Sequence, residues 1–316
     1  MRIGIDIGGS KTRIAYERGG ELHPFHRGPT PQDPAAAVRA IVAAVRAARL
    51  PRAPAALGVG CPGPLDLAAG LVLSPPNLPR WDRFPLAAEL RSALGVPVVL
   101  ENDANAGALG EATRGAARGF PAVLYVTLGT GLGVGIVFGG RVHHGAFGLA
   151  GEVWAFPPAA FDGAPGDNLT SLCSANGLVL QAERRLRAGR ASALPRDGLT
   201  APAILRAFAA GDALAVEVVE LARRALAAAL CFSLHLLAPD IVVLGGGLCR
   251  DESWFVAPLR ERVRAQPGLA ALRQVPVRRA ALWNEAVLWG AIELAGEAAA
   301  AEQTGMKRQF AAEAAK

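Results

Sequence analysis

This chain of 316 residues lacks several features that mark membrane, secreted or metal-binding proteins. Its four cysteines lie far apart and form no CxxC pair, so the sequence predicts neither a zinc cluster nor a redox pair. The most apolar stretch, ALAAALCFSLHLLA from Ala225, is shorter than the roughly 20 residues that cross a bilayer. No charged segment with a long apolar run precedes RIGIDIGG, so we expect no signal peptide and a cytoplasmic protein.

Clustered positive charge is missing too. The net charge is +6, but the arginines are spread over segments with helical patterning and form no block of five or six. We therefore expect no nucleic-acid partner. Lysine is scarce: of three lysines, two lie in the last ten residues and the third is Lys11, beside a glycine pair. A lysine is a compact point charge on a flexible stem, which suits contact with a phosphate.

Strand-like and helix-like segments alternate along the chain, which is typical of an α/β protein. A strand, a glycine turn and a returning strand occur near residue 8 and again near residue 130. A repeat at so large a spacing indicates two related domains. Helices are predicted over residues 33–50, 85–94, 104–115, 174–187, 212–238 and 282–303. Further strands are predicted over residues 55–61, 96–100, 240–247 and 274–280.

The stretch ENDANAGALGE, residues 101–111, places several polar side chains directly after the apolar strand VPVVL. Asn102 and Asp103 stand where the helix should begin, and such residues are favoured N-caps because their side chains accept hydrogen bonds from exposed backbone N–H groups. The residues alone leave open whether these side chains cap a helix or perform chemistry.

Three glycine-rich segments, 6–12, 127–135 and 244–247, could hold phosphate through closely approaching backbone amides. Each could equally make a tight turn. Two familiar nucleotide motifs do not fit. A P-loop requires G-x-x-x-x-G-K-[ST], whereas Ile5 and Ser10 occupy two of its fixed positions. A dinucleotide motif lies between a strand and a helix, whereas these glycines separate two strands, which disfavours hydride transfer.

A strand–glycine turn–strand motif used twice suits a nucleotide held between two domains. Asp6 is expected to hold Mg²⁺ directly or through water, because hard cations prefer oxygen ligands. Ser10, Lys11 and Thr12 would face the terminal phosphates, and the glycines after residue 243 would face the nucleoside. The residues predicted to bind ATP are Asp6, Gly8, Gly9, Ser10, Lys11, Thr12, Thr130, Gly131, Gly245, Gly246 and Gly247.

Taken together, these segments resemble the ROK family of sugar kinases, and PPNLPRW is most similar to the glucokinase branch. The ordered motifs are GIDIGGSKT, GVGCPGPLD, SPPNLPRWDRFPL, ENDANAGALGE, VTLGTGLGVGIVFGGRVHHG, AGE, PDIVVLGGG and LWNEAVLWGAIELA. The resemblance implies a two-domain, actin/hexokinase/Hsp70-like (ribonuclease H-like) ATPase fold with a cleft between domains. We expect an N-terminal domain over residues 1–112, completed by a C-terminal helix at about 284–302. A second domain over 113–283 and a flexible tail over 303–316 would complete the chain.

The resemblance also assigns roles to residues. It implies that Asp103 is the catalytic base, taking the proton of the sugar 6-hydroxyl as that oxygen attacks the γ-phosphate of ATP. Asn102 would bind neighbouring hydroxyls, and Glu152 those near the anomeric carbon. Gly63 and Asn77 would line the same pocket.

The sequence departs from the family between residues 152 and 176. The family's G-E-x-G-H motif reads GEVWA here, with Trp154 for glycine and Ala155 for histidine, and Thr170 stands at the position of a sugar-binding glutamate. Only Cys173 occurs where the family has a cysteine cluster, so we expect no structural zinc. Proline packing in FPPAAF would replace the metal. His143 and His144 are interpreted as side chains at a strand end, outside the site.

The sequence therefore predicts an ATP- and Mg²⁺-dependent kinase that phosphorylates a hexose, with glucose as the first candidate. Fructose, mannose, N-acetylglucosamine and N-acetylmannosamine remain open as substrates, as does polyphosphate as donor. A sugar sensor without catalysis is the alternative from another class. The resemblance further implies a homodimer or homotetramer. From the composition we expect no membrane partner.

Overall fold

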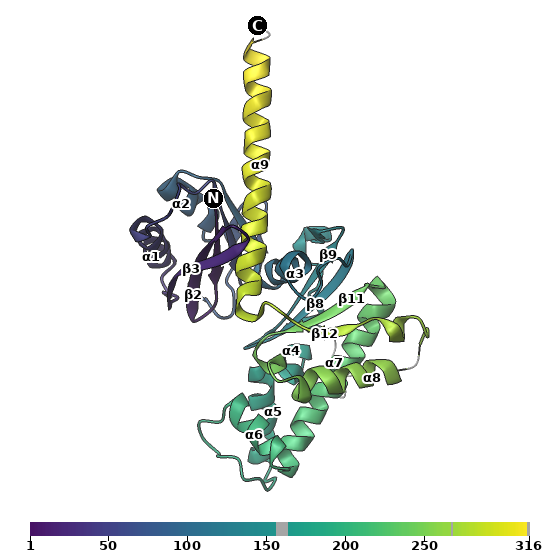
Figure 1. The fold of residues 1–316 in the computed structure, drawn as a ribbon. Coiled ribbons are helices and arrows are strands. Elements are labelled where there is room, and N and C mark those ends of the chain that lie inside the picture. The colour runs from purple at the N-terminus through teal and green to yellow at the C-terminus, as the bar shows by residue number, and fades with distance from the viewer. Residues whose placement is uncertain (156–163, 267, 315–316) are drawn as a thin grey trace. The chain divides into compact units, whose positions relative to one another are not determined.

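The computed structural model describes residues 1–155, 164–266 and 268–314. The chain divides into two compact units (Figure 1). Unit 1 consists of Met1–Gly115, Gly140–Leu149 and Asn284–Lys316, and unit 2 consists of Ala116–Gly139 and Ala150–Trp283. Each unit is built around its own sheet and its own apolar core.

The sheet of unit 1 has five strands in the order β3-β2-β1-β4-β7. The strands are β1 (Arg2–Ile7), β2 (Lys11–Arg18), β3 (Glu21–Pro29), β4 (Ala56–Cys61) and β7 (Val98–Asn102). β1, β2 and β3 form an antiparallel meander, whereas β1, β4 and β7 are parallel. A separate two-stranded sheet joins β5 (Leu65–Asp66) to β6 (Leu71–Val72). The carboxyl ends of the three parallel strands therefore meet at one edge of the larger sheet.

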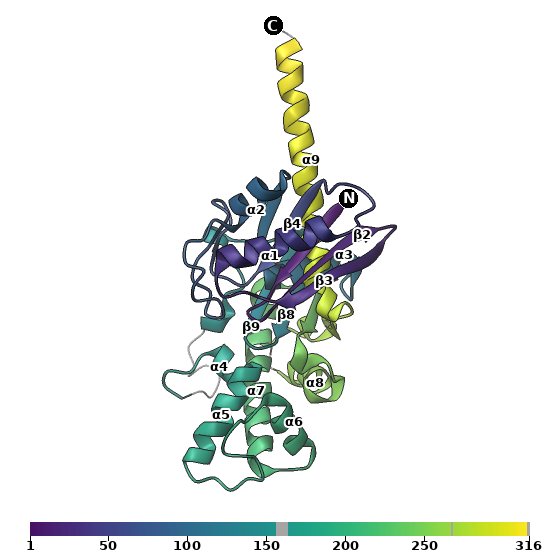
Figure 2. The ribbon, with the colours of Figure 1, turned by 90° about the vertical axis from the view of Figure 1, so that its left-hand side faces the viewer.

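The two faces of this sheet carry side chains of different size. Ile3 and Ile5 of β1 are fully buried in the core that also contains residues of α1 (Pro34–Ala47) and α2 (Leu86–Leu94). Figures 1 and 2 show these two helices on one side of the strands. Side chains alternate between faces along a strand, and the opposite face carries glycines. These glycines allow α9 (Ala286–Ala314) to pack closely against the sheet.

The small residues of ENDANAGALGE have a packing role. They form α3 (Asp103–Arg114), which lies beside α9 with very short backbone separations. A Cβ atom added to Gly110 would lie 2.1 Å from the carbonyl oxygen of Ala286, and one added to Gly290 would lie 1.7 Å from that of Ala106. Larger side chains would force the two helices apart, so the run after Asp103 is required by packing.

The second sheet has the order β10-β9-β8-β11-β12. Its strands are β8 (Ala122–Leu128), β9 (Leu132–Phe138), β10 (Arg141–Val142), β11 (Ile241–Gly245) and β12 (Val277–Arg279). β8 and β9 are antiparallel, and β11 is parallel to both β8 and β12. The predicted internal repeat is present, because each sheet begins with a hairpin closed by a glycine turn and continues with a parallel strand.

Helices supply most of the core of unit 2. They are α4 (Leu169–Cys173), α5 (Ala175–Arg187), α6 (Ala201–Ala209), α7 (Ala213–Leu237) and α8 (Ala257–Ala265). Polar N-caps start four of them: the side chains of Asn168, Ser174, Thr200 and Asp212 accept backbone N–H bonds at α4, α5, α6 and α7. The predicted helices over 174–187 and 212–238 are confirmed. Over the described residues, no helix is both long and apolar enough to cross a membrane.

Several elements were not predicted from the sequence, α6 and α8 among them. The strand β3 was not predicted, because Pro24 and Pro29 interrupt its pattern; it lies at the sheet edge, where prolines are tolerated. The predicted tail from residue 303 is helical as far as Ala314, since α9 continues through a stretch rich in alanine and other good helix formers.

Candidate functional site

The predicted catalytic and metal-binding residues of unit 1 lie at the carboxyl ends of its parallel strands. In the sheet register Asp6 of β1 is opposite Gly60 of β4, and Cys61 is opposite Asn102 of β7. Ligands of open α/β sheets bind at this kind of edge. Burial, together with the negative charges of Asp103 and Asp6, raises the pKa of the Cys61 thiol well above its ordinary value. Cys61 therefore lies within the field of both carboxylates.

Asp6 has a partner that sequence reasoning missed. Arg13 lies opposite it in the β1–β2 hairpin and donates a hydrogen bond to Oδ2 of the Asp6 carboxylate. Burial raises the pKa of Asp6, and the positive charge and hydrogen bond of Arg13 oppose this rise. The hairpin register could have identified Arg13 once the turn over residues 8–10 was predicted.

The first glycine turn brings two predicted site segments together. Its hydrogen bond runs from the Gly8 amide to the Lys11 carbonyl, at 2.8 Å. A Cβ atom on Gly9 would lie only 2.6 Å from Cβ of Asn77, so glycine permits this contact. The side chains of Ser10 and Lys11 are exposed. Lys11 can therefore reach a phosphate from this turn.

Thr12 is placed differently from its neighbours. Its side chain is buried, and its hydroxyl lies 2.9 Å from the Thr30 hydroxyl, which in turn donates to the Gly8 carbonyl at 2.7 Å. These bonds fasten the turn to the end of β3. In this arrangement Thr12 supports the turn from within the protein.

The start of α3 answers the question raised by ENDAN. Asn102 is the N-cap: its Oδ1 accepts hydrogen bonds from the amides of Ala104 at 2.9 Å and Asn105 at 3.3 Å. Its amide nitrogen faces the loop after β4, since a Cβ on Gly63 would lie 3.2 Å from Nδ2. Asp103 follows as the first helical residue and is partly exposed. Asn102 therefore caps α3 through its side-chain oxygen, and its amide nitrogen remains beside the Gly63 loop.

Glu101, just before this cap, is 2% exposed and pairs with a histidine that the sequence analysis set aside. Nε2 of His144 lies 2.7 Å from Oε2 of Glu101. The hydrogen bond to Glu101 raises the pKa of His144, burial opposes the rise, and the charge of Glu101 adds to it. No local sequence signal links these residues, which lie 43 positions apart.

In unit 2 the two remaining glycine segments lie at adjacent strand ends. β8 and β11 are parallel, so Thr130 and Gly131 follow one strand where Gly245–Gly247 end the other. Gly246 has a φ of +83°, and a Cβ there would lie 2.4 Å from the Leu128 carbonyl oxygen. Thr130 is exposed, and an added Cβ on Gly131 or Gly247 would meet nothing within 4 Å. These residues present open backbone suited to a nucleotide.

Glu152, also in unit 2, has an unexpected partner. The indole N–H of Trp154 donates a hydrogen bond to Oε2 of Glu152. Both side chains are exposed. Gly151 sets the position of this turn: its φ is +89°, and a Cβ there would lie 2.6 Å from the Val134 carbonyl oxygen. The tryptophan that departs from the family motif thus contacts the predicted sugar-binding glutamate.

The region of the missing cysteine cluster is organised around Asp167, which is 5% exposed. Its carboxylate accepts hydrogen bonds from Arg184 at 2.5 Å, Ser171 at 3.0 Å and Gln181 at 3.3 Å. Thr170 lies in the adjacent helix α4. Within the described ranges no group of three or more His, Cys, Asp or Glu side chains could hold a metal ion. The segment FPPAAF is residues 156–161, outside the described residues, so its predicted packing stays a prediction.

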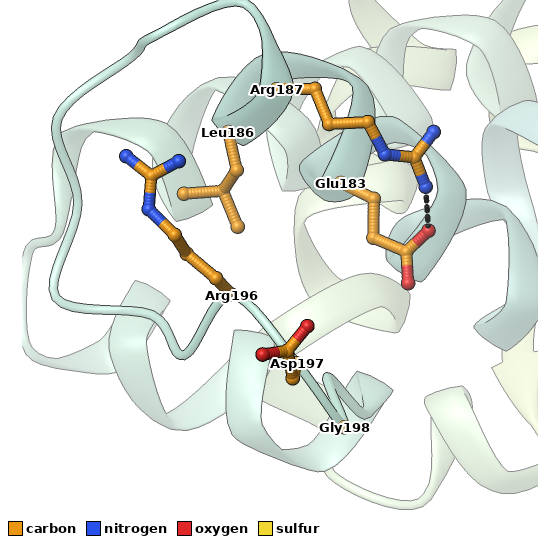
Figure 3. A pocket seen from close by; sticks show the side chains of 6 residues that line it. All are labelled: Glu183, Leu186, Arg187, Arg196, Asp197 and Gly198. Carbon is orange, nitrogen blue, oxygen red and sulfur yellow. Dashed lines mark hydrogen bonds and ion pairs between the residues drawn. The ribbon is translucent and has the colours of Figure 1, made fainter.

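A hollow elsewhere in unit 2 contains none of the predicted site residues. Figure 3 shows its lining residues, which are Glu183, Leu186, Arg187, Arg196, Asp197 and Gly198. Glu183 and Arg187 form an ion pair of 2.7 Å across one helical turn. The hollow is therefore lined largely by charged side chains of the surface.

Comparison with known proteins gives matches over nearly the whole chain. The profile of the ROK family matches residues 2–298. A glucokinase of Streptomyces coelicolor is 35% identical over 312 residues, which cover 94% of this chain and 98% of the relative. The crystal structure of a ROK hexokinase from Thermus thermophilus has a TM-score of 0.77 and 34% identity, covering 93% of this chain and 97% of its own.

A ROK glucokinase from Streptomyces griseus, solved in complex with glucose and AMPPNP, has a TM-score of 0.76 and 31% identity. The alignment covers 94% of this chain and 99% of that one. The predicted fold class, the α/β fold of actin- and hexokinase-like ATPases, is confirmed by these neighbours. The family profile spans nearly the whole length of the chain, and the chain therefore belongs to the ROK family.

Proposed function

We propose that this protein is an ATP-dependent sugar kinase that transfers the γ-phosphate of Mg·ATP to the 6-hydroxyl of glucose. The observation that carries the proposal is the position of Asp103, at the first turn of α3 and at the carboxyl edge of the parallel strands. The glucokinases reported above, similar over nearly the whole chain, support glucose as acceptor.

Asp103 is the proposed general base. A carboxylate at this position would accept the proton of the 6-hydroxyl as the sugar oxygen attacks phosphorus. Phosphoryl transfer proceeds through a loose transition state, so positioning and charge neutralisation carry most of the catalysis. A general base contributes about 10²–10⁴-fold.

Asn102 and Glu152 are the proposed sugar-binding side chains. The Asn102 amide nitrogen, beside Gly63, would donate to a sugar hydroxyl while its oxygen caps the helix. Glu152 would accept hydrogen bonds from hydroxyls near the anomeric carbon. Gly63 and Asn77 would line the same pocket.

Mg²⁺ fits the chemistry around Asp6. Hard cations take oxygen ligands, and Mg²⁺ usually keeps several of its waters. Burial raises the pKa of Asp6, but Arg13 donates a hydrogen bond to Oδ2 and opposes this rise. We infer that Asp6 would hold the ion directly or through water, and the ion would supply charge neutralisation at the phosphates. Lys11 and the turn over residues 8–10 would hold the phosphates, as would Thr130 and Gly131. Gly245–Gly247 would support the nucleoside.

The proposed setting and assembly follow from the same considerations. A reducing cytoplasm is the proposed setting, where the four cysteines, all among the described residues, would stay free thiols. A homodimer or homotetramer is the proposed assembly, by similarity to the family.

The proposal is tested by ADP release in a coupled assay with Mg·ATP. The acceptors are glucose, mannose, fructose, N-acetylglucosamine and N-acetylmannosamine, and polyphosphate is tested as a second donor. Glucose should give the highest kcat/KM. Asp103→Asn should lower kcat by about 10²–10⁴-fold with a similar KM for glucose. Asp197→Asn, an exposed site in unit 2, is the control and should leave both constants unchanged.

Preference for another sugar would keep the kinase and correct the substrate. Absence of turnover with every acceptor, while ATP and glucose still bind, would favour the sugar sensor. Restoration of His at position 155 and Glu at position 170 would then be the next step. Near-normal turnover in Asp103→Asn would overturn the assignment of the base.

A further inference from the structure

The carboxylate of Glu101 connects the start of α3 to a distant turn. Oε1 accepts a hydrogen bond from the backbone amide of Asn102 at 2.9 Å and another from Nδ2 of Asn105 at 3.0 Å. Oε2 contacts Nε2 of His144 at 2.7 Å. Oε1 therefore binds the first turn of α3, and Oε2 binds the segment that follows β10.

Burial makes this contact necessary. The Glu101 side chain is 3% exposed, and a buried carboxylate is costly unless it is hydrogen-bonded and paired with a positive charge. His144 can supply that charge when protonated, and its hydrogen bond to Glu101 raises its pKa. Its ring is 40% exposed, so solvent limits the cost of holding the proton there.

The residues held by Glu101 enclose the proposed catalytic base. Asn102 precedes Asp103 and Asn105 follows it by two positions, so Glu101 binds the chain on both sides of Asp103. We propose that the Glu101–His144 pair fixes the position of Asp103, and that His144 is a positioning residue for phosphoryl transfer. This inference rests on the proposed function, in which Asp103 is the base.

A positioning role predicts a loss in the chemical step. His144→Ala leaves Oε2 of Glu101 without its partner, so the carboxylate can turn toward water and loosen its Oε1 bonds to the first turn of α3. Displacement of a catalytic group by about 1 Å can cost up to ~100-fold in rate, and we expect kcat to fall about 10- to 100-fold. KM for ATP should change little, because Lys11 and Gly8 belong to another turn.

The test compares three variants by kcat, KM and melting temperature. His144→Gln keeps a donor for Glu101 and should recover most of the rate lost in His144→Ala. His143→Gln changes the exposed neighbouring histidine and should behave as the wild type. An equal loss of rate in the Ala and Gln variants, or an unchanged kcat in the Ala variant, would overturn the proposal.

A second comparison separates positioning from general destabilisation. In an Asp103→Asn background, His144→Ala should cause no further loss of the residual rate, because the base through which His144 acts is already absent. A further tenfold loss there would show that His144 supports the fold as a whole and would refute positioning.

The contact itself can be tested without activity. By NMR, Nε2 of His144 should show a strongly hydrogen-bonded signal that shifts in Glu101→Gln. A signal like that of free histidine would overturn the pair whatever the enzyme does. If the signal is present but the wild type phosphorylates no acceptor, the proposed function fails, and this inference fails with it.

Discussion

Asn102 should affect stability and sugar binding through different atoms. Its Oδ1 caps α3 with bonds of 2.9 and 3.3 Å to the amides of Ala104 and Asn105. Its Nδ2 faces the Gly63 loop, where the sugar is proposed to bind. Asn102→Ala removes both functions, whereas Asn102→Ser keeps an oxygen that can cap the helix and removes only the amide nitrogen.

The two variants should therefore differ in stability and agree in sugar binding. Loss of an N-cap costs about 1 kcal/mol. In a domain of ~150 residues that cost lowers the melting temperature by about 2–4 °C. Asn102→Ala should show this decrease, and Asn102→Ser should remain close to the wild type. A lost hydrogen bond to the sugar is worth about 0.5–1.5 kcal/mol, so KM for glucose should rise ~2- to 10-fold in both variants.

Scanning calorimetry and initial rates against glucose concentration measure the two effects on the same preparations. An equal melting decrease in the Ser and Ala variants would show that the cap does not explain the stability. An unchanged KM for glucose in Asn102→Ser, in a protein that does phosphorylate glucose, would refute the proposed contact of the amide nitrogen with the sugar.

Three further predictions concern residues 152–176, where the sequence departs from the family. Burial alone raises the pKa of Asp167, but its hydrogen bonds, that of Arg184 first, outweigh it and hold the pKa below 3.8. Asp167→Asn should thus destabilise unit 2 by about 1–3 kcal/mol at pH 7, a difference that should disappear as pH falls below 3.8, because those bonds need the ionised carboxylate. Equal thermal unfolding curves of the wild type and Asp167→Asn at pH 7 would contradict this prediction. Elemental analysis of the wild type should find no stoichiometric zinc. Trp154→Phe keeps the ring but removes the N–H bond to Glu152, so KM for glucose should rise ~2- to 10-fold at unchanged melting temperature. An unchanged KM would show that Trp154 does not position Glu152.

Much of the fold could be predicted because its signals are local. Alternating residues identified β1, short apolar runs identified β8 and β11, and the glycines after β1 and β8 indicated the two hairpin turns. The acidic start of α7 and the polar start of α3 predicted helices that begin there. Parallel strands then place their carboxyl ends at one edge. A common edge for Asp6 and Asn102 thus follows from the order of the strands.

Only the tertiary structure decided which side chains meet across that edge. The Thr12 hydroxyl is buried against Thr30, and Glu101 contacts His144. Likewise, the glycines of α3 and α9 are explained only by the close contact between these two helices. Such contacts depend on the register of strands and the rotation of helices, and many sequences with the same pattern could make other pairs. Sequence periodicity determines which face a residue occupies, whereas packing determines its partner.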